Sequence, residues 1–175
     1  MNSIIESMIS RRSIRKYKAD MVPKEIIDEI IMAGTYAASA RGEQSAIIIS
    51  VTNKELRDKL SKMNAAIGGW NKDFDPFYGA PVVLIVLAKK DCINRVYDGS
   101  LVMGNLMLAA HSLGIGSCWI HRAKEEFESK EGKEILKALG INEEYEGIGH
   151  CILGYPEGAS KEPVPRKDNY VFYAE

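Results

Sequence analysis

The sequence predicts a layered fold in which helices pack against a single sheet. Short apolar runs, rich in isoleucine and valine, alternate along the 175 residues with longer segments of helical periodicity. Such runs are typical of buried strands, and the longer segments are typical of amphipathic helices. At this length one domain buries about two-thirds of the surface that its unfolded chain exposes. We therefore expect a single domain over residues 1–175, of the α/β or the α+β class.

The predicted helices begin at capping residues and end at glycines. Asn2 precedes a first helix with apolar residues at 4, 5, 8 and 9, and Pro23 suits the first position of a second helix. A third helix restarts after Thr52 by the same capping logic, and a fourth covers residues 98–111. Residues 123–139 predict a charged, broken helix that Gly140 ends.

The apolar runs predict strands at residues 46–51, 82–87, 117–121 and 147–155. The first of them is continuously apolar, so we expect it to be buried on both faces. Residues 64–79 interrupt the pattern with glycines and a group of aromatic side chains. This segment is either a packed cover over the core or a lid over a flat ligand.

The helix predicted at residues 98–111 is apolar on nearly every side. A helix of this kind is buried all round, either inside one chain or between two subunits. If it forms the core of a dimer, a charge introduced at Leu106 should prevent dimerisation.

Composition excludes several classes of protein. A formal net charge of -1 gives no general attraction to nucleic acid, and the longest apolar run, residues 80–88, is far shorter than the roughly 20 residues that cross a bilayer. The three cysteines have no CxxC spacing, which argues against a disulfide framework and a zinc site. We expect a cytoplasmic protein with neither a nucleic-acid nor a membrane partner and with no metal.

The most charged stretch is residues 11–17, which contains Arg11, Arg12, Ser13, Arg15 and Lys16. Like charges so close together repel one another unless water or an anion lies among them. The planar fork of an arginine side chain suits phosphate well. The cluster is therefore either a phosphate site or a solvated turn after the first helix.

Other chemical motifs are absent. The chain has no GxGxxG, P-loop, GxSxG or HExxH sequence. Its histidines, His111, His121 and His150, are far apart in the sequence and are expected to be hydrogen-bonded structural residues. Cys118 is expected to act as a small buried hydrophobic residue.

The order of several motifs along nearly the whole chain resembles the FMN-dependent nitroreductase family. The residues that carry the resemblance are 11–17, 38–44, 77–81, 98–110, 113–121, 145–155 and 165–167. The resemblance implies an α+β fold, with a central mixed, mostly antiparallel sheet flanked by helices in three layers, and a homodimer. The sequence departs from many members around Gln44, where Gly42, Ser45 and Ala46 replace an asparagine and a Pro-Trp pair, so that no side-chain contact is possible at Gly42.

The resemblance also implies an FMN site. Phosphate and ribityl contacts come from the start and the end of the chain, and Arg15 reaches the flavin pyrimidine edge. The loop before the first strand approaches from the other subunit, and residues 119–122 lie along the isoalloxazine with backbone N–H groups near N5. The implied cofactor-binding residues are Arg11, Arg12, Ser13, Arg15, Ser39, Arg41, Gln44, Trp119, Ile120, His121, Arg122, Arg166 and Lys167. Trp70, Phe74 and Phe77 are the candidates for the substrate side.

The expected activity is a ping-pong oxidoreductase in which NADH or NADPH reduces the flavin and a nitroaromatic or quinone then accepts the electrons. No side chain is expected to act as a nucleophile or a base, because the cofactor carries the chemistry. A flavin-binding carrier or redox sensor is an alternative, and so is a basic module that binds an anionic partner without flavin. The sequence distinguishes neither the physiological acceptor nor NADH from NADPH.

Overall fold

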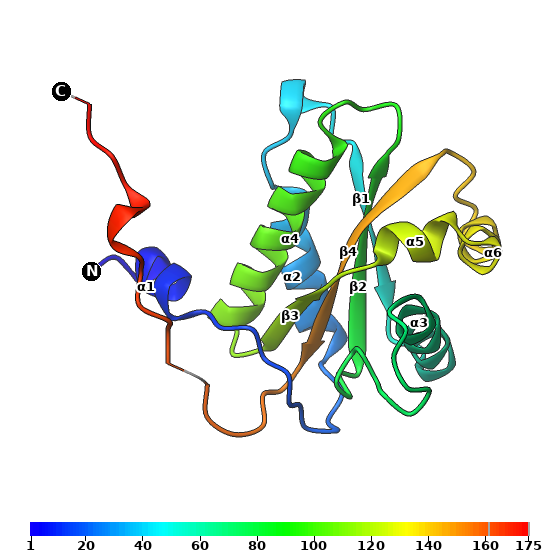
Figure 1. The fold of residues 1–175 in the computed structure, drawn as a ribbon, viewed down its shortest axis with the longest axis horizontal. Coiled ribbons are helices and arrows are strands. Elements are labelled where there is room, and N and C mark those ends of the chain that lie inside the picture. The colour runs from blue at the N-terminus through cyan, green and yellow to red at the C-terminus, as the bar shows by residue number, and fades with distance from the viewer. Residues whose placement is uncertain (161, 175) are drawn as a thin grey trace.

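The computed structural model describes residues 1–160 and 162–174. Its sheet has four strands in the order β1-β2-β4-β3, which are β1 (Ala46–Val51), β2 (Val82–Lys89), β3 (Gly116–Ile120) and β4 (Tyr145–Gly154) (Figure 1). Every neighbouring pair is antiparallel. The only parallel pairing in the described chain is an isolated bridge between Ser13 and Ser117. The α+β prediction is therefore confirmed, whereas the sheet of this chain is antiparallel rather than mixed.

The central strand β2 separates two cores. Its side chains alternate, so that Val83 and Ile85 belong to one apolar cluster while Leu84 and Val86 belong to the other. All of these side chains are fully buried. The apolar run from residue 82 is therefore continuous because both faces of the strand are covered, as the sequence predicted.

Helices cover the two faces of this sheet (Figure 1). On one face lie α2 (Lys24–Thr35) and α4 (Arg95–Ser112). On the other lie α3 (Lys54–Ile67), α5 (Ala123–Glu128) and α6 (Lys130–Ala138). The shorter helices are α1 (Ser3–Ser10), η1 (Ala40–Gly42) and η2 (Asp168–Tyr170). No helix in the described part of the chain is long and apolar enough to span a membrane.

The predicted starts of α1 and α3 and the predicted break are confirmed, whereas Pro23 is the residue before α2 rather than its first, and α4 begins at Arg95, three residues before its predicted start. The Asn2 side chain accepts a hydrogen bond from the N–H of Ile4 at 2.9 Å, and Asn53 caps α3 in the same way. Ser129 separates α5 from α6, and its hydroxyl accepts from the N–H of Gly132 at 3.0 Å. These caps use side chains within three residues of the N–H group that they satisfy, which is why the sequence predicts them.

Strand β1 differs from its prediction. It lies at an edge of the sheet, with β2 as its only neighbour in the described chain. Ile47 and Ile48 are half-buried, and Ser50 is exposed. The expectation of burial on both faces is therefore wrong for this strand within one chain, because the helices cover the edge less completely than the centre.

One chain also leaves one side of α4 uncovered. Met103 and Leu106 are fully buried, whereas Leu101 is 50% exposed and Tyr97 is 72% exposed. Leu106 packs so closely on α2 that a Cβ atom at Gly34 would lie 2.6 Å from its Cδ2. Leu106 therefore lies in the core of the chain itself, so a charge there would act first by destabilising the monomer rather than at a dimer interface.

Both ends of the chain project from the body (Figure 1). Helix α1 has no buried residue, and its apolar positions are 48% to 61% exposed. In the C-terminal tail, residues 170–173 are 59% to 87% exposed although all four are aromatic or branched apolar residues. These segments and the open side of α4 each expose apolar side chains, which is typical of interaction sites.

Candidate functional site

The basic cluster lies along the free edge of β3. The N–H of Ile14 donates to the carbonyl of Ser117 at 2.9 Å, and Ser13 forms a bridge with the same residue. Gly116 allows this approach, because a Cβ atom there would lie 3.1 Å from the Ile14 side chain. The segment from Arg11 to Arg15 is thereby fixed beside the sheet, which is unlike a turn surrounded by water.

Arginines from both ends of the chain meet at one cavity. Its volume is about 860 Å³, and its charged lining residues are Arg11, Arg12, Arg15, Arg166 and Glu162. Ser13 also lines it, together with apolar residues of α1 and the tail. The predicted association of Arg166 with the first cluster is therefore present in the structure. Lys167 does not line the cavity, and its Nζ lies 5.6 Å from the centre of the Tyr170 ring.

Two donors in this cluster lack acceptors. Arg11 Nη1 and Arg12 Nε are buried and have no hydrogen-bond partner in the described chain, although Arg12 Nη1 donates to the carbonyls of Ile9 and Arg11 at 2.7 and 2.6 Å. A buried donor that belongs to a charged group and lacks a partner is costly. An anion with several acceptor oxygens, such as a phosphate, would satisfy both donors, so the residues present fit the phosphate end of FMN.

The positive field extends to His111 in the last turn of α4. Burial, and then the charges of Arg11 and Arg12, hold the pKa of His111 below its usual range. Its Nε2 lies 2.9 Å from the Ser10 hydroxyl. This histidine therefore senses the charge at the cavity, although it does not line it.

At the C-terminal end of β3, backbone groups rather than charged side chains line the surface. Trp119 is half-buried and lies over Gly149, where a Cβ atom would be 2.4 Å from the indole Nε1. Ile120 is 8% exposed and packs in the core, so only its backbone faces outward. His121 is exposed, and Arg122 turns the chain into α5 with φ of 78°.

An aromatic cluster stands beside this turn. The ring centres of Trp70 and Phe74 are 4.9 Å apart, and those of Phe74 and Tyr78 are 5.9 Å apart. The guanidinium of Arg122 lies 4.2 Å from the centre of the Trp70 ring. Trp70 is 41% exposed and Phe74 is 37% exposed, so both can face a substrate.

Phe77 does not belong to this cluster. It is fully buried, with its ring 5.2 Å from that of His150 and 5.5 Å from the Arg57 guanidinium. Its prediction as a substrate-side residue is therefore wrong, because a side chain enclosed in the core cannot contact a substrate. The next residue, Tyr78, contacts Phe74 instead, and the aromatic composition of the segment could not tell the two apart.

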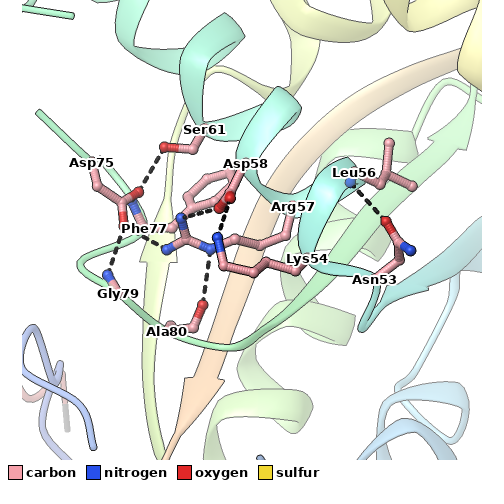
Figure 2. A network of polar contacts seen from close by, with 10 residues as sticks. All are labelled: Asn53, Lys54, Leu56, Arg57, Asp58, Ser61, Asp75, Phe77, Gly79 and Ala80. Carbon is pink, nitrogen blue, oxygen red and sulfur yellow. Dashed lines mark hydrogen bonds and ion pairs between the residues drawn. The ribbon is translucent and has the colours of Figure 1, made fainter. Parts of the chain in front are cut away.

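The aromatic segment is tied to α3 by a polar network (Figure 2). Asp75 accepts hydrogen bonds from the side chains of Arg57 and Ser61 and from the N–H groups of Phe77 and Gly79, at 2.5 to 2.9 Å. Burial by itself raises the pKa of Asp75, but these bonds together hold that pKa below its usual range. The segment is therefore anchored in its second half.

The loop with Ser39, Arg41 and Gln44 lies elsewhere in the chain. Asp98, in the first turn of α4, accepts from the N–H of Ala40 at 3.0 Å and from the Ser45 hydroxyl at 3.1 Å. His111, beside the basic cluster, follows Asp98 by thirteen residues, which is about 20 Å along a helix axis. One chain therefore does not bring this loop to the basic cluster.

Asp98 organises that loop and was missed as a site residue. Arg41 and Gln44 adopt positive φ angles of 56° and 49°, and the Gln44 N–H donates to the Ser39 hydroxyl at 3.1 Å. Such backbone angles persist only where the surroundings fix them. The position of Asp98 at the start of an apolar helix was the available sequence signal, since a carboxylate is favourable there.

Comparison with known proteins agrees with this geometry. The model described as the nitroreductase family matches residues 8–155. A Methanothermobacter thermautotrophicus protein provisionally named NADH dehydrogenase/NAD(P)H nitroreductase is 33% identical over 159 residues, which cover 87% of this chain and 77% of its own length. An FMN reductase (NAD(P)H) of Bacillus subtilis is 26% identical over 191 residues, which cover 95% of this chain and 72% of its own.

A solved structure extends the likeness to three dimensions. A nitroreductase from Bacteroides fragilis with bound FMN superposes on this chain with a TM-score of 0.89, at 27% identity and with 100% of both chains covered. The family match spans most of the chain and includes the basic cluster, β3 and β4. The resemblance drawn from the motifs is therefore confirmed, and the chain belongs to the nitroreductase family.

Proposed function

We propose that the protein uses FMN to pass electrons from NADH or NADPH to a small-molecule acceptor, such as a nitroaromatic or a quinone, by a ping-pong mechanism. The oxidoreductase class follows from membership of the family and from relatives that are named as reductases. The observation that carries the cofactor assignment is the pair of unpartnered buried guanidinium donors of Arg11 and Arg12, in a cavity shared with Arg166.

The residues have distinct roles toward the cofactor. Arg11, Arg12, Ser13 and Arg166 would hold the phosphate and the ribityl chain, because their donors converge on one cavity. Arg15 would lie at the pyrimidine edge of the flavin, where a positive charge stabilises the reduced form. When bound, FMN would supply the hydride-accepting and electron-donating chemistry.

The other end of the site would use backbone donors and aromatic rings. Residues 119–122 would contact the flavin ring chiefly through the main chain, since Ile120 points into the core. Trp70 and Phe74 would form the substrate side, with Tyr78 behind them. We assign no nucleophile or general base, since proximity and the charge of the reduced cofactor are sufficient for the transfer.

We also propose a homodimer with two flavin sites. The open side of α4, the exposed α1 and the exposed tail would be covered by a second copy of the chain. Ser39, Arg41 and Gln44 would then reach the flavin held by the partner subunit, because they are too distant from the basic cluster of their own chain. The three free cysteines, all buried, agree with a reducing cytoplasm.

Absorption and rapid mixing test the activity. The full-length protein is purified, its visible spectrum is recorded, and it is mixed anaerobically with NADH or NADPH in a stopped-flow instrument. We expect a yellow protein whose flavin absorbance bleaches on a catalytic timescale and returns when a quinone is added. A yellow protein that does not bleach would favour the carrier or sensor. A colourless protein that does not take up FMN would contradict the cofactor assignment.

A further inference from the structure

Two backbone carbonyls at the end of β3 are held by fully buried polar side chains. The carbonyl oxygen of His121 accepts a hydrogen bond from Asn64 Nδ2 at 2.8 Å. The carbonyl oxygen of Ile120 lies 3.4 Å from His150 Nδ1. Asn64 and His150 are both 0% exposed. We call these two side chains, with Glu126, the carbonyl brace.

Glu126 completes the brace from a third element. Its Oε2 lies 2.6 Å from His150 Nε2, and it is also 0% exposed. Both ring nitrogens of His150 thus face an oxygen, with the Glu126 carboxylate at Nε2 and the Ile120 carbonyl at Nδ1. Asn64 comes from α3, Glu126 from α5 and His150 from β4. Asn64 Oδ1 and Glu126 Oε1 have no hydrogen-bond partner in the described chain, so the brace acts through Asn64 Nδ2, the His150 ring and Glu126 Oε2. Paired buried polar groups fix one geometry, because leaving them unpaired is costly.

The brace determines the direction of two N–H groups. In a trans peptide the carbonyl of one residue and the N–H of the next point in opposite directions. The described chain has no cis peptide bond. The Ile120 carbonyl faces β4 opposite His150, so it turns the N–H group of His121 away from that strand, and the His121 carbonyl, bonded to the buried Asn64, turns the N–H group of Arg122 away from α3. Neither N–H donates to another group of the described chain. They form a pair of free donors on adjacent residues.

The turn that follows is strained and enclosed. Arg122 has φ of 78°, which is a conformation that a residue with a side chain adopts only where its surroundings fix it. Here the Asn64 bond holds the preceding carbonyl, and the Arg122 guanidinium lies over Trp70. The N–H of Trp70 in turn donates to the carbonyl of Ala65, next to Asn64, at 3.0 Å. The free donors and the aromatic cluster are therefore parts of one fixed unit.

We propose that Asn64, and His150 together with Glu126, are positioning residues for the redox chemistry. They hold the N–H groups of His121 and Arg122 outward as a preformed donor pair. Donors fixed in advance stabilise developing negative charge without having to reorganise. The inference rests on the proposed function, in which the flavin ring lies along residues 119–122, and none of the three side chains touches the flavin.

Asn105 provides a matched control for Asn64. Its Nδ2 donates to the carbonyl of Ala33 at 3.0 Å and so joins α4 to α2 on the opposite face of the sheet. Replacement of either asparagine by alanine removes one amide-to-carbonyl hydrogen bond between two elements. A purely structural role would give both variants similar consequences for the flavin.

The first test measures the midpoint potential of the bound flavin. Asn64→Ala, the smaller change Asn64→Ser, and Asn105→Ala are compared with the original protein for their midpoint potential with FMN bound. We expect Asn64→Ala to bind reduced FMN about tenfold more weakly relative to oxidised FMN, which lowers a two-electron potential by about 30 mV. Asn64→Ser should shift it in the same direction, and Asn105→Ala should leave it unchanged. Equal potentials in all four proteins would overturn the proposal.

The second test needs no flavin. In the flavin-free protein, the amide resonances of His121 and Arg122 are recorded by ¹⁵N NMR for the same variants. We expect them to move in both Asn64 variants and to stay in place in Asn105→Ala, and unmoved resonances in the Asn64 variants would overturn the brace. If the original protein bound no FMN at all, the proposed function would fail, whereas this measurement would still decide whether the brace exists.

Discussion

The two ends of strand β3 offer a ligand different kinds of groups. At its start, the Arg11–Arg12 segment and Arg166 present charged side chains, some of which lack partners. At its end, His121 and Arg122 present backbone N–H groups, and buried side chains contact the carbonyls that precede them. The first end suits a phosphate, whose charge attracts any well-placed cation. The second suits a group whose charge changes during reaction, for which the direction of each donor matters.

Precise placement of donors matters more at the second end than at the first. A guanidinium on a long, flexible side chain can adjust to its ligand. A peptide group cannot, because its position is set by the residues that pack against it. The structure accordingly places fully buried polar residues behind the second end, and the Arg57–Asp75 network beside it (Figure 2). Substitutions at each end should show whether the two ends depend on the fold to different degrees.

The largest effect is expected from charges on the two sides of α4, which runs from the loop at Ser39 to the basic cluster at the start of β3. Leu106→Glu should destabilise the chain by at least about 4 kcal/mol, because it places a charge in the core without a partner. Leu101→Glu should leave a folded chain that is monomeric and empty of flavin. Thermal unfolding and analytical ultracentrifugation measure both results.

Leu139→Glu is the control for Leu101→Glu. Leu139 is also 50% exposed, but it lies at the end of α6 on the other face of the sheet. The Leu139→Glu variant should be dimeric and should keep its bound flavin. A flavin-loaded monomer from Leu101→Glu would contradict the proposal that the partner completes the site.

The hydrogen bonds between Arg57 and Asp75, beside the C-terminal end of β3, should contribute to the stability of the fold. Arg57→Ala leaves the carboxylate of Asp75 without its charged partner, and we expect a loss of about 2–3 kcal/mol in the free energy of unfolding. Urea unfolding measures this loss. Because Asp75 has a lowered pKa when folded, its contribution is present above its unfolded pKa and is lost as the pH falls through the folded value. The difference between the variant and the original protein should therefore shrink in acid, and a constant difference would contradict this account.

The first end should matter for affinity rather than for stability. Arg11→Ala and Arg166→Ala should each weaken FMN binding by about 1.5–3 kcal/mol, as expected for a charge-assisted hydrogen bond. Titration of the flavin-free protein, followed by flavin fluorescence, gives the change. Lys16→Ala is the control, because Lys16 is exposed and lies 3.3 Å from Glu157. Unchanged affinity in both arginine variants would refute the phosphate assignment.

The smallest effect concerns His111. Without ligand its pKa is held down by burial and by Arg11 and Arg12, and a bound phosphate should offset the arginine charges and raise that pKa. NMR titration of the ring protons, with and without FMN, measures the change. A pKa that FMN leaves unmoved would place the phosphate elsewhere.

The same lowered pKa makes stability depend on pH. In the flavin-free protein, folding favours the neutral form of His111, so the contribution of His111 to stability is full above its unfolded pKa and falls as the pH drops toward its folded value.

Much of the fold was predictable from short-range patterns. Strand β1 was predicted to the residue, and the caps at Asn2 and Asn53 and the break near Ser129 depend on neighbours in the chain. The basic cluster could also be predicted, because the number of charged residues in a short segment can be counted directly in the sequence. The aromatic segment was recognised, but its assignment failed at Phe77, since the direction in which a packed loop turns two adjacent aromatic residues depends on long-range contacts.

The main helices, the strands to within two residues, the family and the cation-rich end of the site could be predicted from the sequence. Packing in three dimensions fixed which side of α4 stays open, which aromatic rings face outward, and which buried residues contact the backbone at the other end of β3. Periodicity, capping and charge act over a few residues and can be read along the chain. The contacts of Asn64 with His121, and of His150 with Glu126, join residues that are 57 and 24 positions apart, so they exist only once the helices and strands have packed.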